Sequence, residues 1–320
     1  MNDLQNKIRE RIQAATRVLV TSHIRPDGDA IGSSLGLALA LIDAGKQVQV
    51  VLSDGIAASF KHLPGSELVR TKAEGKFDLI VSVDCSDLAR IGKALDGYHA
   101  PDIIIDHHVT TEGFGTLNLV EPEAVATASV LMRHMAEWGL VITKPIAANL
   151  LTGLVTDTLG FRTSNITSEA LRQAADLLDL GAELSELYYR SLVQRTYTAA
   201  KYWGLGLNSL EHADGMVWAT LTVADRKAVG YGGRDDADLV NIISSIENEN
   251  VAIIFVEQNA EKTKVSWRAL NPKFDVSQVA KEFKGGGHKA AAGAEMSGSL
   301  TEVKERILQA TRKMMEKYQS

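Results

Sequence analysis

Acidic and imidazole side chains follow three short apolar runs of this sequence, at the point where each run ends. They are, in chain order, His23, Asp27, Asp29, Asp84, Asp106, His107 and His108. Two carboxylates one residue apart, such as Asp27 and Asp29, repel each other when buried, and a pair of divalent cations removes that repulsion. Mixed imidazole and carboxylate ligands suit a metal such as Mn²⁺. Acids or imidazoles after all three runs therefore predict one shared site.

A fourth segment places Asp157 at the end of an almost wholly apolar helical stretch. A carboxylate buried there must be paired, hydrogen-bonded or bound to metal. A salt bridge to Arg162 is the alternative, and the other three segments favour a metal ligand. For the first segment, the alternative is an Asp-Gly turn before a helix that Asp29 caps. For His107 or His108 taken singly, the alternative is a core histidine.

The elements that must position these residues are those of a parallel sheet. The apolar runs lie at 17–21, 47–52, 78–83 and 102–105. A helical pattern at 30–44 ends at Gly45, a typical residue after a helix C-terminus. Continuous apolar runs between helices indicate strands that are buried on both faces. We therefore expect an α/β domain with a doubly wound parallel sheet, which places ligands at the carboxyl ends of its strands.

Beyond this sheet, the pattern changes to shorter strands mixed with helices. Helices are expected at 147–156 and 168–180, a helical connector at 184–203, and strands at 216–222, 252–257 and 264–269. A last helix at 301–318 begins with the capping-box pair Ser299 and Glu302. We expect two domains, a catalytic one at 1–185 and a smaller α/β one at 206–320, joined by a connector at 186–205.

A glycine run in the second half is a further candidate binding element. Gly285, Gly286, Gly287 and His288 precede an alanine-rich stretch that is expected to be helical. Backbone N–H groups in such a loop at a helix N-terminus bind phosphate, and His288 adds charge. Arg268, on the strand expected at 264–269, is a second candidate for a phosphate or base contact. The alternatives are a flexible loop and an arginine in a surface ion pair.

Composition limits the partners of such a site. The chain has 320 residues, of which 45% are hydrophobic and 23% charged, and this is ordinary globular composition. Forty acids against 34 bases give a formal charge of −6, which argues against binding of long duplex nucleic acid. The single cysteine, Cys85, excludes an internal disulfide framework, and no stretch has the apolar length of a signal peptide or membrane span. We expect a cytoplasmic protein that does not contact membranes.

Taken together, these segments resemble the DHH phosphoesterase superfamily, which is named for the triplet found here at 106–108. The His-x-x-x-Asp-x-Asp spacing from His23, the isolated Asp84, the triplet and Asp157 are similar to the four motifs of that family, in the same order. The glycine–histidine run resembles that of the family's C-terminal DHHA1 domain, with departures at Lys284 and Ala269. Size and layout look most like the NrnA-type oligoribonucleases, or nanoRNases, which also dephosphorylate 3′-phosphoadenosine 5′-phosphate (pAp).

The resemblance implies a hydrolase with two divalent cations, for which we expect Mn²⁺ before Mg²⁺ or Co²⁺. His23, Asp27 and Asp84 would hold one cation, and Asp29, Asp84, His107 and Asp157 the other. Such a pair lowers the pKa of a shared water, which can then attack phosphorus. Asp84 and His108 would be the catalytic residues, with His108 orienting the scissile phosphate.

The same resemblance implies that the second domain selects the substrate across a cleft between the domains. Arg268 and the loop of Gly285, Gly286, Gly287 and His288 would hold the remaining phosphate or base, with Arg90 and Arg162 as weaker candidates. The partners would be short single-stranded RNA or small nucleotides. A homodimer is compatible with the sequence, and the oligomeric state stays open.

Several other interpretations compete with this one. A family II inorganic pyrophosphatase would lack the glycine–histidine run, and a RecJ-type exonuclease would be longer. A membrane-type cyclic-dinucleotide phosphodiesterase would need preceding spans, whereas a soluble enzyme acting on pApA or cyclic di-AMP stays open. A non-catalytic nucleotide-binding module would be expected to have lost a ligand. A Rossmann dehydrogenase would carry G-x-G-x-x-G after the first strand.

Overall fold

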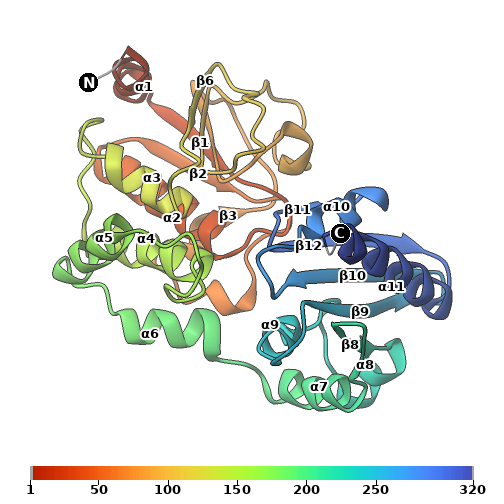
Figure 1. Cartoon of the computed structure of the whole chain (residues 1–320). Helices are drawn as coiled ribbons and strands as arrows, with labels where there is room; N and C mark the ends of the chain where they lie inside the picture. Colours follow the sequence, from red (N-terminus) through yellow and green to blue (C-terminus); the bar gives the residue numbers. More distant parts are fainter. Residues whose placement is uncertain (1–2, 319–320) are drawn as a thin grey trace. The chain divides into compact units, whose positions relative to one another are not determined.

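The computed structural model describes residues 3–318. The chain divides into two compact units between Gln194 and Arg195, within the segment 186–205 where a connector is expected. Each unit has its own six-stranded sheet (Figure 1). Across residues 3–318, no helix combines the length and the apolar character that crossing a membrane requires.

The first unit contains a wholly parallel sheet with the order β3-β2-β1-β4-β5-β6. Its strands are β1 (Arg17–Thr21), β2 (Gln47–Val51), β3 (Val69–Arg70), β4 (Leu79–Val83), β5 (Ile103–Asp106) and β6 (Leu117–Val120). The chain runs outward from β1 to β3, returns to pair β4 with β1, and runs outward again to β6. The predicted α/β sheet is confirmed, and the reversal between β1 and β4 creates the switch point at which such sheets bind ligands.

Helices and short turns cover both faces of this sheet. They are α1 (Asp3–Ala14), α2 (Gly28–Asp43), α3 (Thr127–His134), α4 (Lys144–Asp157), α5 (Ser168–Asp179), α6 (Leu184–Tyr188), the 3₁₀ turns η1 (Ala58–Phe60), η2 (Ser66–Leu68) and η3 (Leu88–Ile91), and the π-helical η4 (Tyr189–Val193). Successive side chains of β1 point to opposite faces. Val18 and Val20 join the larger core with residues of α1 to α4, whereas Leu19 joins a smaller core with Ile91 and Leu95.

The second unit contains a mixed sheet with the order β11-β12-β10-β9-β8-β7, in which only β8 and β9 pair in parallel. Its elements are α7 (Tyr197–Asn208), β7 (Glu211–Ala213), β8 (Met216–Leu221), α8 (Val223–Val229), α9 (Leu239–Ile243), β9 (Val251–Asn259), β10 (Lys262–Ala269), α10 (Val276–Glu282), β11 (Gly286–Gly287), β12 (Ala291–Ser297) and α11 (Leu300–Lys317). The predicted capping box at the start of the last helix is present, because Ser299 and Glu302 exchange backbone and side-chain hydrogen bonds.

Two sequence-based expectations in this region are wrong. The alanine-rich stretch is strand β12 and not a helix, because Ala292, Ala294 and Met296 are buried at every second position while the strand pairs with β10. The helix expected at 184–203 is interrupted, because Gln194 is extended and the Thr196 side chain caps a new helix, α7.

Helices α2 and α4 approach closely along a stripe of glycines. Gly28, Gly32 and Gly36 recur every fourth residue and therefore lie on one face of α2. A Cβ atom on Gly32 would lie 2.4 Å from the carbonyl oxygen of Asn149 in α4, and one on Gly28 would lie 2.4 Å from the Thr156 side chain. The absence of side chains on this stripe therefore sets the distance between the two helices.

We predict that Gly32→Ala destabilises the protein by about 1–3 kcal/mol, because the added methyl group must displace the backbone of α4. Gly204, within α7, is the matched control, since nothing lies within 4 Å of a Cβ atom built there. Gly204→Ala should stabilise the protein by about 0.5–1 kcal/mol, because alanine favours the helix interior. Urea unfolding measures both changes, and a Gly32→Ala protein as stable as the wild type would contradict this account of the helix packing.

Candidate metal centre

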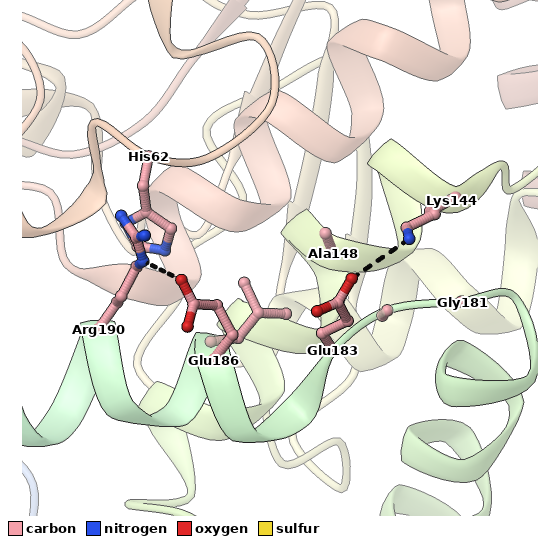
Figure 2. Close-up of a pocket in the computed structure, with 9 residues that line it drawn as sticks. His62, Lys144, Ala148, Gly181, Glu183, Glu186 and Arg190 are labelled. Atoms are coloured by element: carbon pink, nitrogen blue, oxygen red, sulfur yellow. Dashed lines mark hydrogen bonds and ion pairs between the residues drawn. The ribbon is translucent and has the colours of Figure 1, made fainter.

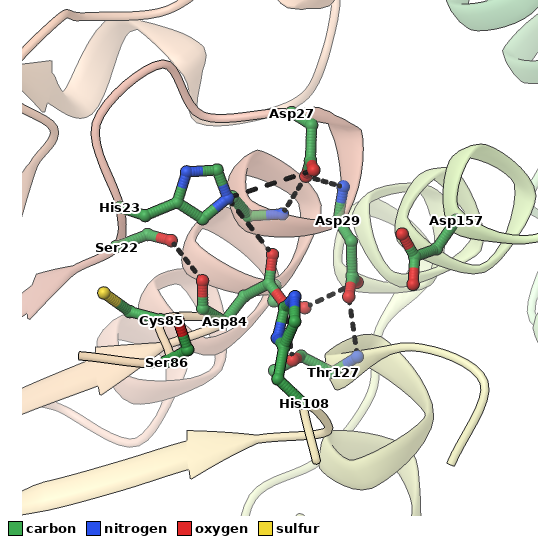
Figure 3. A network of polar contacts seen from close by, with 12 residues as sticks. Ser22, His23, Asp27, Asp29, Asp84, Cys85, Ser86, His108, Thr127 and Asp157 are labelled. Carbon is green, nitrogen blue, oxygen red and sulfur yellow. Dashed lines mark hydrogen bonds and ion pairs between the residues drawn. The ribbon is translucent and has the colours of Figure 1, made fainter. Parts of the chain in front are cut away.

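Three strands of the first sheet end at one cluster of acids and imidazoles (Figure 3). His23 follows β1, Asp84 directly follows β4, and Asp106 ends β5, so that His107 and His108 come next. Asp29 from the first turn of α2 and Asp157 from the end of α4 complete the cluster. The side chains that the sequence places after separate runs therefore lie together, at the switch point between β1 and β4.

One group of possible ligand atoms forms around His23. Its Nε2 atom lies 3.6 Å from Oδ2 of Asp84 and 3.9 Å from Oδ2 of Asp27. Its Nδ1 atom lies 2.8 Å from the carbonyl oxygen of Ile24, which can only accept a hydrogen bond. Nδ1 therefore carries a proton, and in the neutral ring Nε2 is left as the atom that can bind a cation.

A second group forms around His107 in the same way. Its Nε2 atom lies 3.3 Å from Oδ2 of Asp157 and 3.7 Å from Oδ1 of Asp84. Its Nδ1 atom lies 3.3 Å from the carbonyl oxygen of Ala124, so Nε2 again faces the acids. Ligand atoms of Asp29, His107 and Asp157 all lie within 4.8 Å of one another, as do those of His23, Asp27 and Asp84. Each group offers the mixed nitrogen and oxygen donors that suit a divalent transition metal.

Asp84 lies between the two groups and presents a different oxygen to each. Oδ2 faces His23, and Oδ1 faces His107. Its backbone has a φ of 53°, in the left-handed region that few non-glycine residues occupy. Burial alone would raise the pKa of Asp84, but the contact with His23 and the charges of His107 and His108 lower it. Asp84 is therefore held as a carboxylate although it is 2% exposed.

In the two acids of the second group, burial and neighbouring negative charge outweigh the contacts that favour ionisation. Burial, followed by the negative charge of Asp84, raises the pKa of Asp29 well above its usual range. Burial also raises the pKa of Asp157 well above its usual range, and the charges of Asp29 and Asp84 add to this effect. Buried carboxylates in this condition are stabilised by a proton or by a cation.

The contacts of Asp27 and Asp157 bear on the alternatives that the sequence leaves open. Asp27, and not Asp29, caps α2, because its Oδ1 atom accepts hydrogen bonds from the amides of Asp29 and Ala30 while Oδ2 faces His23. The ring of His107 lies 3.3 Å from the carboxyl group of Asp157, and the side chain of Arg162 is exposed. Asp27 therefore both caps helix α2 and contributes an oxygen to the acid cluster.

Asp106 is wholly buried and orients the two histidines that follow it. Its Oδ1 atom accepts hydrogen bonds from the amide of His107, at 2.8 Å, and from Nδ1 of His108, also at 2.8 Å. The hydroxyl of Thr111 donates to Oδ2. Burial alone would lower the pKa of His108, but the bond to Asp106 and the charges of Asp84 and Asp106 raise it to about 9. These contacts favour the protonated, positively charged form of His108.

The candidate residues of the second unit lie on or beside β10 and β11, two strands that both pair with β12. Arg268 on β10 pairs with Ala291 of β12, and its guanidinium donates to the Trp267 carbonyl oxygen at 3.1 Å. Gly286 and Gly287 form β11, which pairs with β12, so the expected loop at a helix N-terminus is wrong. His288 closes the turn to Ala291 through two backbone hydrogen bonds.

Close strand pairing explains why this run contains glycine. A Cβ atom on Gly285 would lie 2.3 Å from the carbonyl oxygen of Gly293, and Gly287 has a φ of 141°. The glycine signal in the sequence thus reports a tight edge of the sheet, which strand β12 separates from the strand that carries Arg268.

A pocket of about 360 Å³ elsewhere in the first unit contains none of the predicted site residues (Figure 2). Its charged groups pair with one another, Lys144 with Glu183 at 3.3 Å and Arg190 with Glu186.

Among the sequence candidates of the first unit, Arg90 donates to the Ser86 hydroxyl at 3.5 Å. The chemistry of the unit is concentrated in the acid and imidazole cluster.

Sequence reasoning missed Thr127, at the start of α3. Its hydroxyl donates to Oδ1 of Asp84 at 3.0 Å, and its amide donates to Oδ2 of Asp29 at 2.6 Å. It lies 98 residues from Asp29 along the chain, in a segment without a motif. Only the folded structure reveals these contacts.

Comparisons with known proteins match both units. Residues 17–154 match the DHH family, N-terminal domain, and residues 225–317 match the DHHA1 domain. The chain is 34% identical over 309 residues to the bifunctional oligoribonuclease and PAP phosphatase NrnA of Thermus thermophilus, covering 92% of this chain and 89% of that protein. It is 24% identical over 284 residues to the protein of the same name from Bacillus subtilis, covering 87% of this chain and 89% of that one.

Solved structures of similar fold include an exopolyphosphatase-related protein from Bacteroides fragilis. Its TM-score is 0.88 at 27% sequence identity, and the match covers 98% of this chain and 96% of that one. RecJ from Thermus thermophilus has a TM-score of 0.53 at 16% identity, with 97% of this chain and 54% of that chain covered. At that identity, the likeness to RecJ concerns the fold.

We predict that Asp157→Asn leaves the cation-free protein as stable as the wild type, or more stable, while reducing its stabilisation by divalent cations. The raised pKa means that folded wild type binds the Asp157 proton more tightly than the unfolded chain does. Without cations, the wild-type protein should therefore become less stable relative to the Asp157→Asn variant as the pH rises above about 4.

Thermal unfolding from pH 4 to 8, with and without divalent cations, measures both effects. Cations that bind only the folded state raise its stability by about 2.7 kcal/mol at 100 times their dissociation constant. Equal stabilisation of wild type and variant by cations would exclude Asp157 from the candidate centre.

Proposed function

This chain belongs to the DHH family of phosphoesterases, and on that premise we propose that it is a metal-dependent hydrolase of short oligoribonucleotides and of pAp. It would release nucleoside 5′-monophosphates from the former and the 3′-phosphate from the latter. The observation that carries this proposal is the convergence of acids and imidazoles at the ends of β1, β4 and β5. The alternative, a soluble phosphodiesterase for pApA or cyclic di-AMP, would use the same cluster.

The proposed substrate class rests on the names of two similar proteins and on the net charge of this chain. The Thermus thermophilus and Bacillus subtilis relatives are named for both activities, and the match spans most of each chain. A formal charge of −6 suits a small nucleotide substrate better than a long duplex. The single cysteine, Cys85, provides no disulfide framework, which suits the cytoplasmic location that we include in the proposal.

Two cations, with Mn²⁺ as the preferred ion, would be held at the two groups of ligand atoms. The proposed first set is His23, Asp27 and Asp84, and the proposed second set is Asp29, Asp84, His107 and Asp157. The separate oxygens that Asp84 turns toward His23 and His107 support its place in both sets. Nitrogen and oxygen donors together favour Mn²⁺ over Ca²⁺, which prefers oxygen alone.

When bound, such a pair of cations lowers the pKa of a water molecule, which can then attack phosphorus at neutral pH. The chain's own contribution is the placement of positive charge. The contacts with Asp106 and Asp84 favour the protonated form of His108, and we assign it the role of orienting the scissile phosphate and stabilising charge on its oxygens. Asp106 keeps that ring in place through its bond to Nδ1.

In the second unit, we propose that Arg268 and the segment Gly285, Gly286, Gly287 and His288 bind the remaining phosphate or base. Arg268 pairs with Ala291 on one side of β12, and Gly287 pairs with Ala292 on the other side, which supports a common binding region. Burial lowers the pKa of Arg268, and Asp236 and Asp238 partly offset this effect. A phosphate would supply the partly buried guanidinium with a strong, charged acceptor.

We predict that Asp84→Asn lowers kcat on dinucleotides by more than about 100-fold, because it removes a ligand common to both sets. Loss of a residue that only hydrogen-bonds to a metal ligand already lowers metal affinity or activity about 10–100-fold. Asp87→Asn is the control. Asp87 lies three residues away and caps η3, and asparagine can also cap. The assay panel is di- to pentaribonucleotides, pAp, pApA, cyclic di-AMP and pyrophosphate with Mn²⁺. An unimpaired Asp84→Asn variant, or faster turnover of pyrophosphate than of any dinucleotide, would reject the proposal.

We predict that Arg268→Ala raises KM for dinucleotides about 10-fold or more while turnover of a small aryl phosphodiester is unchanged, because the small ester lacks the second phosphate and base that this residue would bind. Arg312→Ala, in the same unit, removes a surface ion pair with Asp214 and should change neither substrate. Steady-state kinetics on both substrates give the comparison. Equal effects of Arg268→Ala on the two substrates would argue against substrate selection by this residue.

A further inference from the structure

Helix α3 begins without a side-chain cap of its own. Its N-cap residue, Ala126, cannot accept a hydrogen bond through its side chain. The first amides of the helix donate instead to Asp29, from Thr127 to Oδ2 at 2.6 Å and from Ala128 to Oδ1 at 3.1 Å. Because unpaired amides at a helix N-terminus carry partial positive charge, these bonds favour the ionised form of Asp29.

These bonds restrict which atom of Asp29 can bind a cation. Oδ1 also accepts a hydrogen bond from the hydroxyl of Ser33 at 3.1 Å, so this oxygen accepts two protein donors. Oδ2 accepts one, from Thr127. Since each carboxylate oxygen has about two lone-pair directions, Oδ2 keeps one direction for a cation and Oδ1 keeps none.

The side chain of Thr127 fixes a second carboxylate. Its hydroxyl donates to Oδ1 of Asp84 at 3.0 Å, and Thr127 is wholly buried. This is the oxygen that lies 3.7 Å from Nε2 of His107, whereas the other oxygen of Asp84 faces His23. Thr127 therefore contacts Asp84 on the side of the second ligand set.

Packing around Asp29 leaves it little freedom to adopt another position. A Cβ atom on Gly153 of α4 would lie 2.5 Å from Oδ1 of Asp29 and 2.8 Å from Cβ of Ala128. Helices α2, α3 and α4 thus meet at this carboxylate, and Asp29 is 1% exposed.

We propose that Thr127 is a positioning residue for the second cation. It joins Asp29, through its amide, and Asp84, through its hydroxyl, into one ligand set in which each carboxylate offers a single oxygen. This inference rests on the proposed two-cation function and specifies how one of the two sites is built. Within residues 3–318, Thr127 forms no hydrogen bond to His23 or Asp27, the two members of the first set that the second does not share.

Thr127→Val tests the hydroxyl, because valine has the same shape and keeps the backbone amide. The variant should bind the second Mn²⁺ ion about 10–100-fold more weakly than wild type, as is typical when an outer contact to a ligand is lost. Binding of the first ion should be unchanged. Thr127→Ser retains the hydroxyl and should restore two-ion binding.

The experiment is a Mn²⁺ titration of the full chain by calorimetry, with electron paramagnetic resonance of the bound ions. A coupled pair gives a different spectrum from a single Mn²⁺ ion, so at equal loading Thr127→Val should show the single-ion signal and Thr127→Ser the coupled one. Cation-free melting temperatures verify that each variant is folded. If Thr127→Val does not fold, Thr127→Ala replaces it and must show the same selective loss.

Wild-type affinity for both ions in the folded hydroxyl-free variant would overturn the role of Thr127 and leave the proposed hydrolase intact. An equal loss of both ions would also overturn it, because a general structural defect would explain that result. A wild-type chain that binds fewer than two Mn²⁺ ions would overturn the two-cation proposal together with this inference.

Discussion

Mutual repulsion among buried carboxylates is the constraint on which the first unit depends. Asp84 is kept ionised by three imidazoles, whereas Asp29 and Asp157 have raised pKa values because burial and neighbouring charges oppose their ionisation. The amides of α3 offset part of this cost at Asp29. The remaining imbalance is what a divalent cation would neutralise, so a cluster that is unfavourable for the protein alone is suited to binding metal.

The fold concentrates these charges through two geometric devices. The reversal of strand order between β1 and β4 brings their carboxyl ends together, which places His23 beside Asp84. The glycine stripe of α2 allows α4 to approach, which brings Asp157 toward the end of β5. The sheet supplies one part of the cluster and the helix pair supplies the rest, so the separation of α2 and α4 matters to the site as well as to stability.

The sequence predicted the parallel sheet and the clustered residues because both leave local signals. Buried parallel strands are continuous apolar runs, and acids after such runs stand out. Features made by contacts between distant segments left no signal, and Thr127, which touches Asp29 and Asp84, is the example. At β12, alanine composition suggested a helix, and pairing with β10 overrode that preference. The glycine run predicts a phosphate-binding loop, whereas in the structure its conformation follows from close strand pairing.

Asp27 divides its two oxygens between two tasks, since Oδ1 accepts the amides that start α2 while Oδ2 faces His23. Asparagine caps helices as well as aspartate does and can present its amide oxygen to the same backbone donors. Exchange of one oxygen for an amino group would therefore preserve the helix start and remove negative charge from the cluster. At this position, a single base change from an aspartate codon to an asparagine codon would therefore separate the folding of α2 from the charge of the cluster.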